Sequence, residues 1–292
     1  MRAVLILLIT GALASGQTPI DLLEEKTRAR ISKLDQVTDG VIGLYARDLI
    51  TGRAIEYHAG VIFPQASSIK IAILIELFYA VEAGKIRLED EVTLSEADSV
   101  GGSGKLRELL KPGASHKLTI RELAVTMMRD SDNTSTNKLI SMLGIEAINN
   151  RIQSFGLKTV KLQRKMIDVQ AASADRENVG SPEEMAKLIE VIWRGQAVNQ
   201  KASSEMLEIL KLVPGDIRKS VPAGVPVALK TGGLAGVHTE TAVVMLQHHP
   251  YALSLASSFL GSDVNPLPEM ARIIYEHFEK LEHSNSFGNR VR

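Results

Sequence analysis

The chain of 292 residues contains no cysteine. Disulfide bonds, thiolate catalysis and cysteine-based metal sites are therefore excluded. It also has no excess of charge, because 34 Lys and Arg residues balance 34 Asp and Glu residues. This balance gives no electrostatic basis for binding nucleic acid or an anionic membrane. The composition is that of a globular protein, and the length suits one large domain or two interlocked ones.

After the N-terminal segment the sequence has no apolar run long enough to span a membrane. Met1-Arg2 is followed by the apolar residues 3–13 and then by the small residues Ala14, Ser15 and Gly16. This pattern predicts a secretory signal peptide over residues 1–16, cleaved after Ala14 or Gly16. The run is short for a membrane span, although an N-terminal anchor is the alternative. We expect a periplasmic or secreted protein with no membrane contact after cleavage.

The apolar patterning predicts strands towards both ends of the chain and helices between them. Between Leu88 and Leu212 almost only helices and loops are expected. The other predicted elements are helices over 18–37 and 266–281, with strands over 41–47, 53–58, 225–230, 240–247 and 251–260. A further buried helix is expected to begin near Ser67.

Strands from both ends of the chain predict one five-stranded antiparallel sheet, and hence an α+β fold with two lobes. Residues 17–65 and 213–292 would form the sheet lobe with its terminal helices. Residues 66–212 would form an inserted all-helical lobe, and the two would make one catalytic domain. We expect the functional site in the cleft between the lobes.

Ser67-Ser68-Ile69-Lys70 introduces the long apolar run of the central helix. A serine and a lysine three residues apart share one helix face. A lysine whose charge is disfavoured by burial can act as the base that a serine nucleophile needs. Taken alone, this spacing favours an ordinary helix start with a solvated serine, because Ser-x-x-Lys occurs by chance in many proteins.

Two further polar segments lie later in the chain. Asp130-Ser131-Asp132-Asn133 separates two predicted helices, where such residues serve either as a helix cap or as groups aimed into a cleft. Lys230-Thr231-Gly232-Gly233 follows a predicted strand. It could hold a carboxylate and let a ligand approach the backbone, or it could be a strand end with a turn.

Ser-x-x-Lys, Ser-Asp-Asn and Lys-Thr-Gly occur here in one order and in matching structural contexts, as in class A β-lactamases and penicillin-binding proteins. The chain resembles class A β-lactamase-like serine hydrolases, members of the penicillin-recognising serine enzymes. The resemblance covers nearly everything after residue 16. It includes the segments 118–123, 134–137, 181–186 and 222–224.

The resemblance implies a role for each site residue. Ser67 would form the acyl-enzyme, Lys70 would help remove its proton, and Ser131, close to Lys230, would pass a proton to the leaving nitrogen. The substrate-binding residues implied are Asn133 for a side-chain amide, Lys230 and Thr231 for a carboxylate, and the N–H groups of Ser67 and Gly233 for the oxyanion. No metal or organic cofactor is implied.

The resemblance fails on the Ω-loop that floors the site. Class A enzymes carry Arg-x-Glu-x-x-Leu-Asn there, and the glutamate activates the deacylating water. In this chain Arg164 is present, but Met166 stands at the glutamate position and Gln170 at the asparagine position. Asn178 stands where an acid usually pairs with the arginine. A shifted alignment would bring Asp168 or Glu177 into the catalytic role, whereas Asp168 could instead pair with Arg164 or cap the loop.

Methionine has no useful proton acceptor, so the sequence predicts acylation without fast deacylation. The leading prediction is a serine hydrolase acylated by β-lactams. The alternatives are a D-alanyl-D-alanine peptidase or transpeptidase acting on cell-wall peptides, and a protein that binds β-lactams or muropeptides without turnover. In each case the partner is a small-molecule β-lactam or a cell-wall peptide.

Overall fold

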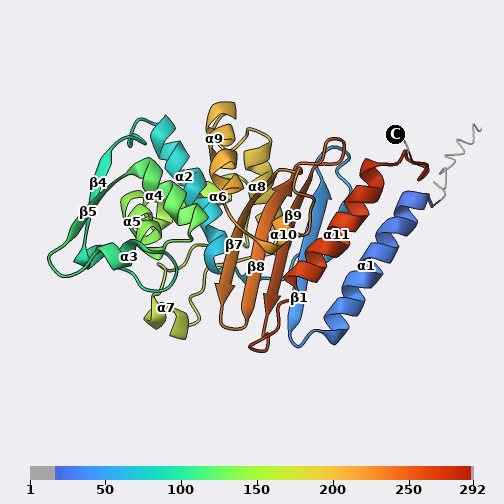
Figure 1. The fold of residues 1–292 in the computed structure, drawn as a ribbon, viewed down its shortest axis with the longest axis horizontal. Helices are drawn as coiled ribbons and strands as arrows, with labels where there is room; N and C mark the ends of the chain where they lie inside the picture. Colours follow the sequence, from blue (N-terminus) through green and yellow to red (C-terminus); the bar gives the residue numbers. More distant parts are fainter. Residues whose placement is uncertain (1–16, 291–292) are drawn as a thin grey trace, which may run out of the picture.

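The computed structural model describes residues 17–290 (Figure 1). The predicted signal peptide lies outside these residues. One five-stranded antiparallel sheet has the order β2-β1-β9-β8-β7. Its strands are β1 (Val41–Asp48), β2 (Ala54–Tyr57), β7 (Val227–Leu234), β8 (Val237–Val244) and β9 (Tyr251–Ser258). The predicted α+β fold with strands from both ends of the chain is confirmed.

Helices cover both faces of this sheet. The first helix, α1 (Pro19–Val37), and the last, α11 (Leu267–Glu282), lie side by side on one face (Figure 1). On the other face α8 (Pro182–Trp193) packs against β1, β8 and β9. The sheet is therefore buried on both sides, and β9 is buried at every position.

The remaining helices form a lobe around α2 (Lys70–Glu82), in which ten residues are buried. This near-continuous apolar sequence suits a helix surrounded by others, and α2 contacts α4, α5, α6, α8 and α9. The lobe contains α3 (Leu106–Leu109), α4 (Ile120–Arg129), α5 (Asn133–Leu143), α6 (Ile145–Ser154), α7 (Val169–Ser173) and α9 (Gln200–Lys211). Short helical turns occur at η1 (Ala66–Ile69), η2 (Glu96–Asp98) and α10 (Asp216–Lys219).

Two small sheets in this region were not expected from the sequence. Strands β4 (Glu91–Ser95) and β5 (Ser115–Thr119) form an antiparallel hairpin with a long connection. Strand β3 (Phe63–Pro64) pairs with β6 (Val179–Gly180) and joins the entry of the nucleophile segment to the end of the Ω-loop. Both strands of the second pair are too short to produce a period-two pattern.

The prediction that β7 ends near Lys230 is wrong. The strand continues through both glycines to Leu234, and the turn is formed by Ala235 and Gly236. Gly236 has a φ of +71°, which explains why glycine is favoured in that turn. Within residues 17–290, no helix combines the length and hydropathy needed to cross a bilayer.

Candidate active site

Ser67 lies in η1, a tight turn that runs directly into α2. Ala66, the residue before it, has a φ of +45°, which non-glycine residues rarely adopt. Ser67 is half-buried and lines a cavity, whereas Ser68 is fully buried. The turn therefore presents the hydroxyl of Ser67, and not that of its neighbour, to the cleft.

Lys70 is the first residue of α2 and is fully buried. Its Nζ lies 2.7 Å from the carbonyl oxygen of Ser131, 3.1 Å from Ser131 Oγ and 3.1 Å from Asn133 Oδ1. Burial lowers the pKa of Lys70 well below its ordinary value, and the nearby charge of Lys230 lowers it further. No hydrogen bond joins Lys70 to Ser67 among the described residues, so Lys70 is tied to the opposite wall of the cleft.

Ser131 connects the two buried lysines of the site. Its Oγ is 3.1 Å from Lys70 Nζ and 3.1 Å from Lys230 Nζ. Lys230 Nζ also donates to the carbonyl oxygen of Thr231 at 2.9 Å. Burial lowers the pKa of Lys230 to about 7, against the opposing effect of the Glu240 carboxylate. Burial therefore lowers the pKa of both lysines, and each favours the neutral state of the other.

A neutral Lys70 beside a charged Lys230 is one distribution of protons that satisfies these contacts. A neutral Lys70 donates its two N–H bonds to the Ser131 carbonyl and Asn133 Oδ1, and its lone pair accepts the Ser131 hydroxyl proton. A charged Lys230 donates to Ser131 Oγ and to the Thr231 carbonyl. The pair then carries one positive charge, which limits the repulsion between two buried ammonium groups.

The loop between α4 and α5 holds Ser131 in a left-handed conformation, with a φ of +53°. Asp132 fixes this loop from both sides. Its Oδ1 accepts the N–H of Ser135 at 2.8 Å, and its Oδ2 accepts the N–H of Leu106 at 3.1 Å. Asp132 is thus the helix cap in this segment. Its neighbours Ser131 and Asn133 contact Lys70.

The Lys-Thr-Gly segment lies inside β7 and faces η1. A Cβ atom on Gly232 would lie 2.9 Å from the backbone nitrogen of Ser67, so glycine allows the strand to pass against the nucleophile turn. Leu234 and Val237 flank the two-residue turn, and hydrogen-bonded pairs alternate along the hairpin from there. By this alternation the N–H of Gly233 points away from β8.

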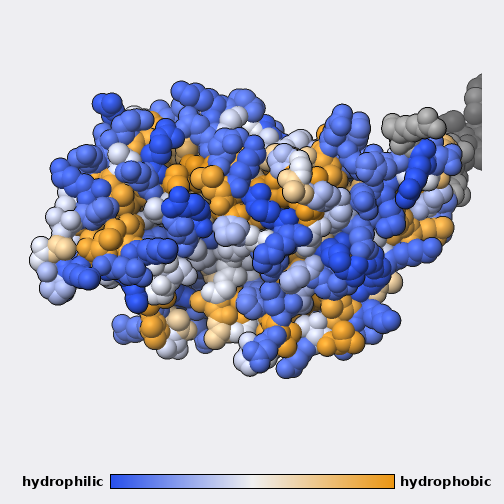
Figure 2. All heavy atoms as spheres, in the orientation of Figure 1, coloured by the Kyte–Doolittle hydropathy of each residue, from blue (hydrophilic) through white to orange (hydrophobic). Residues whose placement is uncertain are grey.

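A cavity of about 570 Å³ opens at this junction. Its lining comes from η1, the loop before α3, the start of α5, the Ω-loop and the end of β7, and includes Ser67, Ser103, Asn133, Met166, Ile167, Val169, Gly233 and Leu234. Three of these apolar side chains are exposed, namely Ile167, Val169 and Leu234. Figure 2 shows apolar patches near α7 and at the lower end of the sheet hairpin, together with other apolar areas over the helical lobe and the middle of this face.

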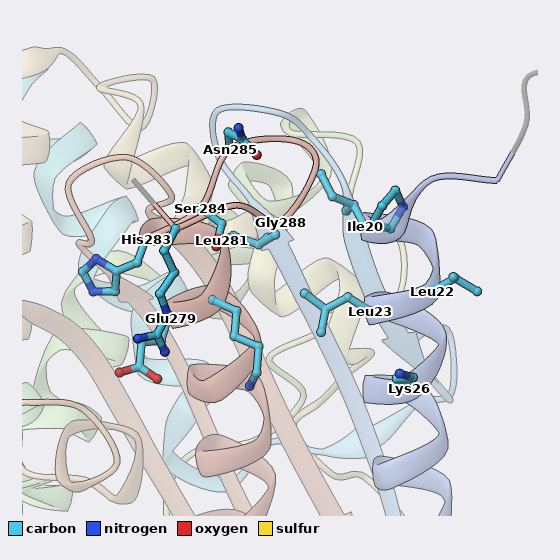
Figure 3. A pocket seen from close by; sticks show the side chains of 13 residues that line it. Ile20, Leu22, Leu23, Lys26, Glu279, Leu281, His283, Ser284, Asn285 and Gly288 are labelled. Atoms are coloured by element: carbon cyan, nitrogen blue, oxygen red, sulfur yellow. The ribbon is translucent and has the colours of Figure 1, made fainter. Parts of the chain in front are cut away.

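A larger cavity of about 1010 Å³ lies between the start of α1 and the chain after α11 (Figure 3). Its lining includes Leu23, Lys26, Glu279, His283 and Asn285. These side chains contain no buried base paired with a nucleophile, in contrast to the cavity at Ser67. The smaller cavity is therefore the candidate active site.

The base of the Ω-loop is closed by Arg164 and Glu177. The Arg164 guanidinium makes three hydrogen bonds to the Glu177 carboxylate, at 2.8 to 3.2 Å. Asn178 closes the same base through backbone groups, because its Oδ1 accepts the N–H groups of Gln163 and Arg164. Glu177 therefore provides the carboxylate that the family pattern places at position 178. An acidic residue directly before Asn178 is the feature of the sequence that could have indicated this partner.

Asp168 does not pair with Arg164. Its Oδ1 accepts the N–H of Ala171 at 2.9 Å, so it caps α7, as one of the sequence alternatives predicted. Of the two acids that a shifted alignment would make catalytic, Asp168 therefore serves as a cap and Glu177 as the partner of Arg164.

Asn137 holds the backbone of Met166, the residue at the position where the family has its glutamate. Its N–H donates to Asn137 Oδ1 at 2.8 Å, and its carbonyl accepts from Asn137 Nδ2 at 3.0 Å. Its side chain is almost buried, belongs to the hydrophobic core and lines the same cavity as Ser67. Asn137, which the resemblance places beside a glutamate side chain, here holds the backbone of a methionine.

The structure brings together most of the site residues predicted from the sequence. Ser67, Asn133, Arg164, Met166 and Gly233 line one cavity. Lys70, Ser131 and Lys230 form the hydrogen-bonded chain beside it.

Two predicted residues are placed differently from the rest. Gln170 is exposed on α7 and is not part of the cavity lining, and Thr231 joins the hydrogen-bonded chain only through its carbonyl oxygen. Ser68 and Thr239, a buried hydroxyl pair behind the nucleophile, were not anticipated, since buried hydroxyls leave no pattern in a sequence.

A serine on a tight turn, two buried lysines sharing a second serine, and a cleft between a sheet and a helical lobe define a penicillin-recognising serine hydrolase. Comparison with known proteins supports this assignment. The family model described as "Beta-lactamase enzyme family" matches residues 26–278. The chain belongs to the β-lactamase enzyme family.

The similar proteins are related at low sequence identity. A β-lactamase from Rhodobacter capsulatus is 24% identical, over 86% of this chain and 84% of that protein. The carbapenem-hydrolysing β-lactamase KPC from Klebsiella oxytoca is 28% identical, over 73% of this chain and 74% of that protein. The crystal structure of a β-lactamase from Sphaerobacter thermophilus superposes with a TM-score of 0.80 and 26% identity, covering 88% of this chain and 97% of that one. The fold is therefore that of class A β-lactamases.

Proposed function

We propose that β-lactams acylate this protein at Ser67 with opening of the ring amide, and that the acyl group is then released slowly. The observation that carries the proposal is the cavity shared by Ser67, Gly233 and Met166. It combines a nucleophile with an oxyanion donor, and it has a thioether where the family's water-activating carboxylate is expected.

The proposed acylation step requires Lys70 Nζ, which contacts Ser131 and Asn133 in this structure, to turn towards Ser67 when substrate is bound. Ser67 Oγ attacks the carbonyl carbon, and its proton passes to the neutral Lys70. The developing oxyanion accepts hydrogen bonds from the backbone N–H groups of Ser67 and Gly233. As the C–N bond breaks, the nitrogen takes a proton from Ser131, which Lys70 replaces across the existing contact.

The remaining roles concern substrate binding. The positive charge of Lys230, with Thr231, suits a substrate carboxylate. Asn133 already accepts from Lys70 and donates to the Gly101 carbonyl at 2.9 Å. It therefore orders the wall of the cavity on which a substrate's amide side chain would lie.

Slow release follows from the absence of a free base in the cavity lining. A thioether sulfur is only a weak acceptor and does not take a proton from water. The two carboxylates that line the cavity are engaged, Asp168 with the N-terminus of α7 and Glu177 with Arg164. Loss of a general base typically slows a step by roughly 10²–10⁴-fold.

Intact-mass spectrometry after addition of a penicillin tests the proposal. We expect an adduct with the mass of the intact drug that persists for hours and is lost in Ser67→Ala. An adduct that clears within seconds while hydrolysed drug accumulates would show that another group deacylates the enzyme. Absence of both adduct and hydrolysis would exclude β-lactams as substrates.

The peptidase alternative is tested in the same experiment. A peptide ending in D-Ala-D-Ala is added in place of the drug, with and without an amine acceptor. Release of D-alanine faster than the release of a penicilloyl group would assign the site to cell-wall peptides.

We further propose that the protein is exported, on the basis of the charged start and short apolar run of residues 1–16. The site would then be exposed to β-lactams or cell-wall peptides in the periplasm or outside the cell. Fractionation of expressing cells, with N-terminal sequencing of the product, tests for cleavage after Ala14 or Gly16.

A further inference from the structure

A chain of buried hydroxyl groups joins the nucleophile turn to the sheet. Ser68 Oγ lies 2.8 Å from Thr239 Oγ1, and Thr239 Oγ1 donates to the carbonyl oxygen of Gln65 at 3.0 Å. Ser68 Oγ is also 3.3 Å from the carbonyl oxygen of Lys230. Ser68, Thr239 and Gln65 are all at most 1% exposed, so no substrate can touch them.

The direction of this chain is fixed by proton count. A carbonyl oxygen only accepts, so the single hydroxyl proton of Thr239 goes to Gln65. Ser68 then donates to Thr239 across the shorter, 2.8 Å contact, in preference to the 3.3 Å contact with the Lys230 carbonyl. Removing the Thr239 hydroxyl would break both links, and it would leave the Gln65 carbonyl without this donor in a region that water does not reach.

The chain spans the most constrained part of the site. Thr239 Oγ1, the Gln65 carbonyl and the Ser67 nitrogen would lie 2.5, 2.6 and 2.9 Å from a Cβ atom on Gly232. The backbone of β7 is thus pressed directly against η1. The distance between the Ser67 and Gly233 N–H groups depends on how firmly this contact is held.

Ala66 adds a reason for such a restraint. Its left-handed conformation is unfavourable for a residue with a side chain, and it immediately precedes Ser67. The bond from Thr239 to Gln65 fixes the peptide that enters Ala66, and Ser68 fixes the turn just after Ser67. The strained residue and the nucleophile are therefore held on both sides.

We propose that Ser68 and Thr239 are positioning residues that hold the Ser67 N–H in the oxyanion hole. The inference rests on the proposed acyl transfer at Ser67. It predicts that stabilisation of a tetrahedral oxyanion depends on a threonine hydroxyl that never contacts the ligand.

The test compares Thr239→Val, which keeps the shape and removes the hydroxyl, with Thr239→Ser, which restores it. Thr241→Val is the matched control. Thr241 lies two residues further along β8, is equally buried, and bonds Ser254 at 3.2 Å instead of η1. Thermal unfolding of all the variants identifies purely structural losses.

Two readouts are measured on each folded protein. The first is the acylation rate with a fluorescent penicillin, separated from its non-covalent binding. The second is the Kd of phenylboronic acid, whose conversion to a tetrahedral serine adduct is followed by ¹¹B NMR. We expect Thr239→Val to slow acylation and weaken boronate binding by tenfold or more, with penicillin binding unchanged and both effects reversed in Thr239→Ser.

The outcomes separate this inference from the proposed function. Boronate binding without penicillin acylation would reject the proposed function and still test the positioning role. The positioning role would be contradicted if Thr239→Val stayed within twofold of wild type in both acylation rate and boronate Kd, or changed them no more than Thr241→Val does. Ser68 and Thr239 would then be a structural contact only. Wild-type protein that forms no boronate adduct would overturn the inference, because Ser67 would then lack a working oxyanion hole.

Discussion

Ser131 shows how one hydroxyl group can link two buried lysines. Its hydroxyl has a single proton, yet it lies at hydrogen-bond distance from two lysine nitrogens. The serine can donate to only one of them, so the other must be the donor. The two equal contacts do not decide which lysine is the donor, and the proposed acylation needs a neutral Lys70 beside a charged Lys230.

At the residue scale, Met166→Glu should restore what the Ω-loop lacks. The backbone of residue 166 is held by Asn137 at 2.8 and 3.0 Å, so a new carboxylate would enter the cavity from the same point. We expect the acyl-enzyme to be released faster by roughly 10²-fold or more, because a general base typically contributes that much. The measurement is the decay of the penicilloyl adduct by intact mass.

Met166→Gln is the control for this prediction, since glutamine has the size and polarity of glutamate but cannot take a proton. It should leave the lifetime of the adduct close to that of the wild type. Equal lifetimes for the Glu and Gln variants would mean that release is limited by something other than a missing base.

Individual residues were predictable where a motif fixes their spacing. Ser67, Lys70 and Ser131 could be assigned because their types and contexts occur together. The partner of Arg164 was not predicted, because position 178, where the family has an acid, is an asparagine, and the pairing considered for Asp168 does not form; Glu177 is the partner. The Ser68–Thr239 pair had no signal, because contacts between residues 171 positions apart depend on the packed fold.

At the scale of elements, the Ω-loop is a segment with little regular structure that is closed at its base. Only α7 is helical between Arg164 and Asn178. The closing contacts are the Arg164–Glu177 ion pair and the side chain of Asn178. Loss of this closure should loosen the floor of the cavity without unfolding either lobe.

Glu177→Gln tests this closure. It removes the charge that pairs with a nearly buried guanidinium, so we expect a loss of about 1–3 kcal/mol in the free energy of unfolding. Hydrogen exchange should accelerate mainly over residues 164–178. The measurements are urea unfolding and amide exchange followed by mass spectrometry.

Glu208→Gln removes an ion pair of the opposite kind, between Lys211 and a largely exposed carboxylate. Its effect should stay within about 0.5 kcal/mol. A similar loss in both variants would mean that the Arg164–Glu177 pair has no special role in the loop.

Helices and strands were predicted well where the hydrophobic pattern extends over many residues, and poorly where the patterned segment is short. The helix predicted over residues 18–37 is observed as Pro19–Val37 with Thr18 as its N-cap, and its start was indicated by the threonine followed by proline. The strand β7 was predicted to end early because two glycines usually indicate a turn. Here they stay extended because η1 leaves no room for side chains, and only tertiary packing decides this.

At the scale of the whole molecule, α1 and α11 join the two ends of the chain. The buried His277 of α11 lies 3.0 Å from Thr27 Oγ1 of α1. Thr27 already donates its proton to the Leu23 carbonyl, so His277 must donate from Nδ1. Burial lowers the pKa of His277 to about 4, with Lys280, Arg28 and Arg53 adding to the effect and Glu24 opposing it.

Because of His277, we expect the folded protein to lose stability in acid. Because its pKa in the folded state is depressed, its contribution to stability is fully present above pH 6.5 and is lost as the pH falls towards 4. The loss should be on the order of 3 kcal/mol. Urea unfolding at several pH values should show a steeper decline for wild type than for His277→Asn, which keeps a donor and does not titrate. Parallel declines would exclude His277 as the cause.

We also propose that the lobes divide as the sequence suggests, with residues 17–65 and 213–292 around the sheet and residues 66–212 in the helical lobe. The helix α8 lies inside the second span yet packs against three strands of the sheet. The two lobes therefore share one core. We expect them to unfold in one calorimetric transition.

The side-by-side first and last helices have a topological consequence. The start of α1 and the residues after α11 line one cavity, so the two ends of the described chain meet at one corner of the molecule (Figure 3). This cavity shares no lining residue with the cavity at Ser67. The order in which the elements are connected is therefore not essential to their packing. A short linker across that corner would make the backbone a closed ring, and a new opening could be placed in an exposed loop with the cleft undisturbed.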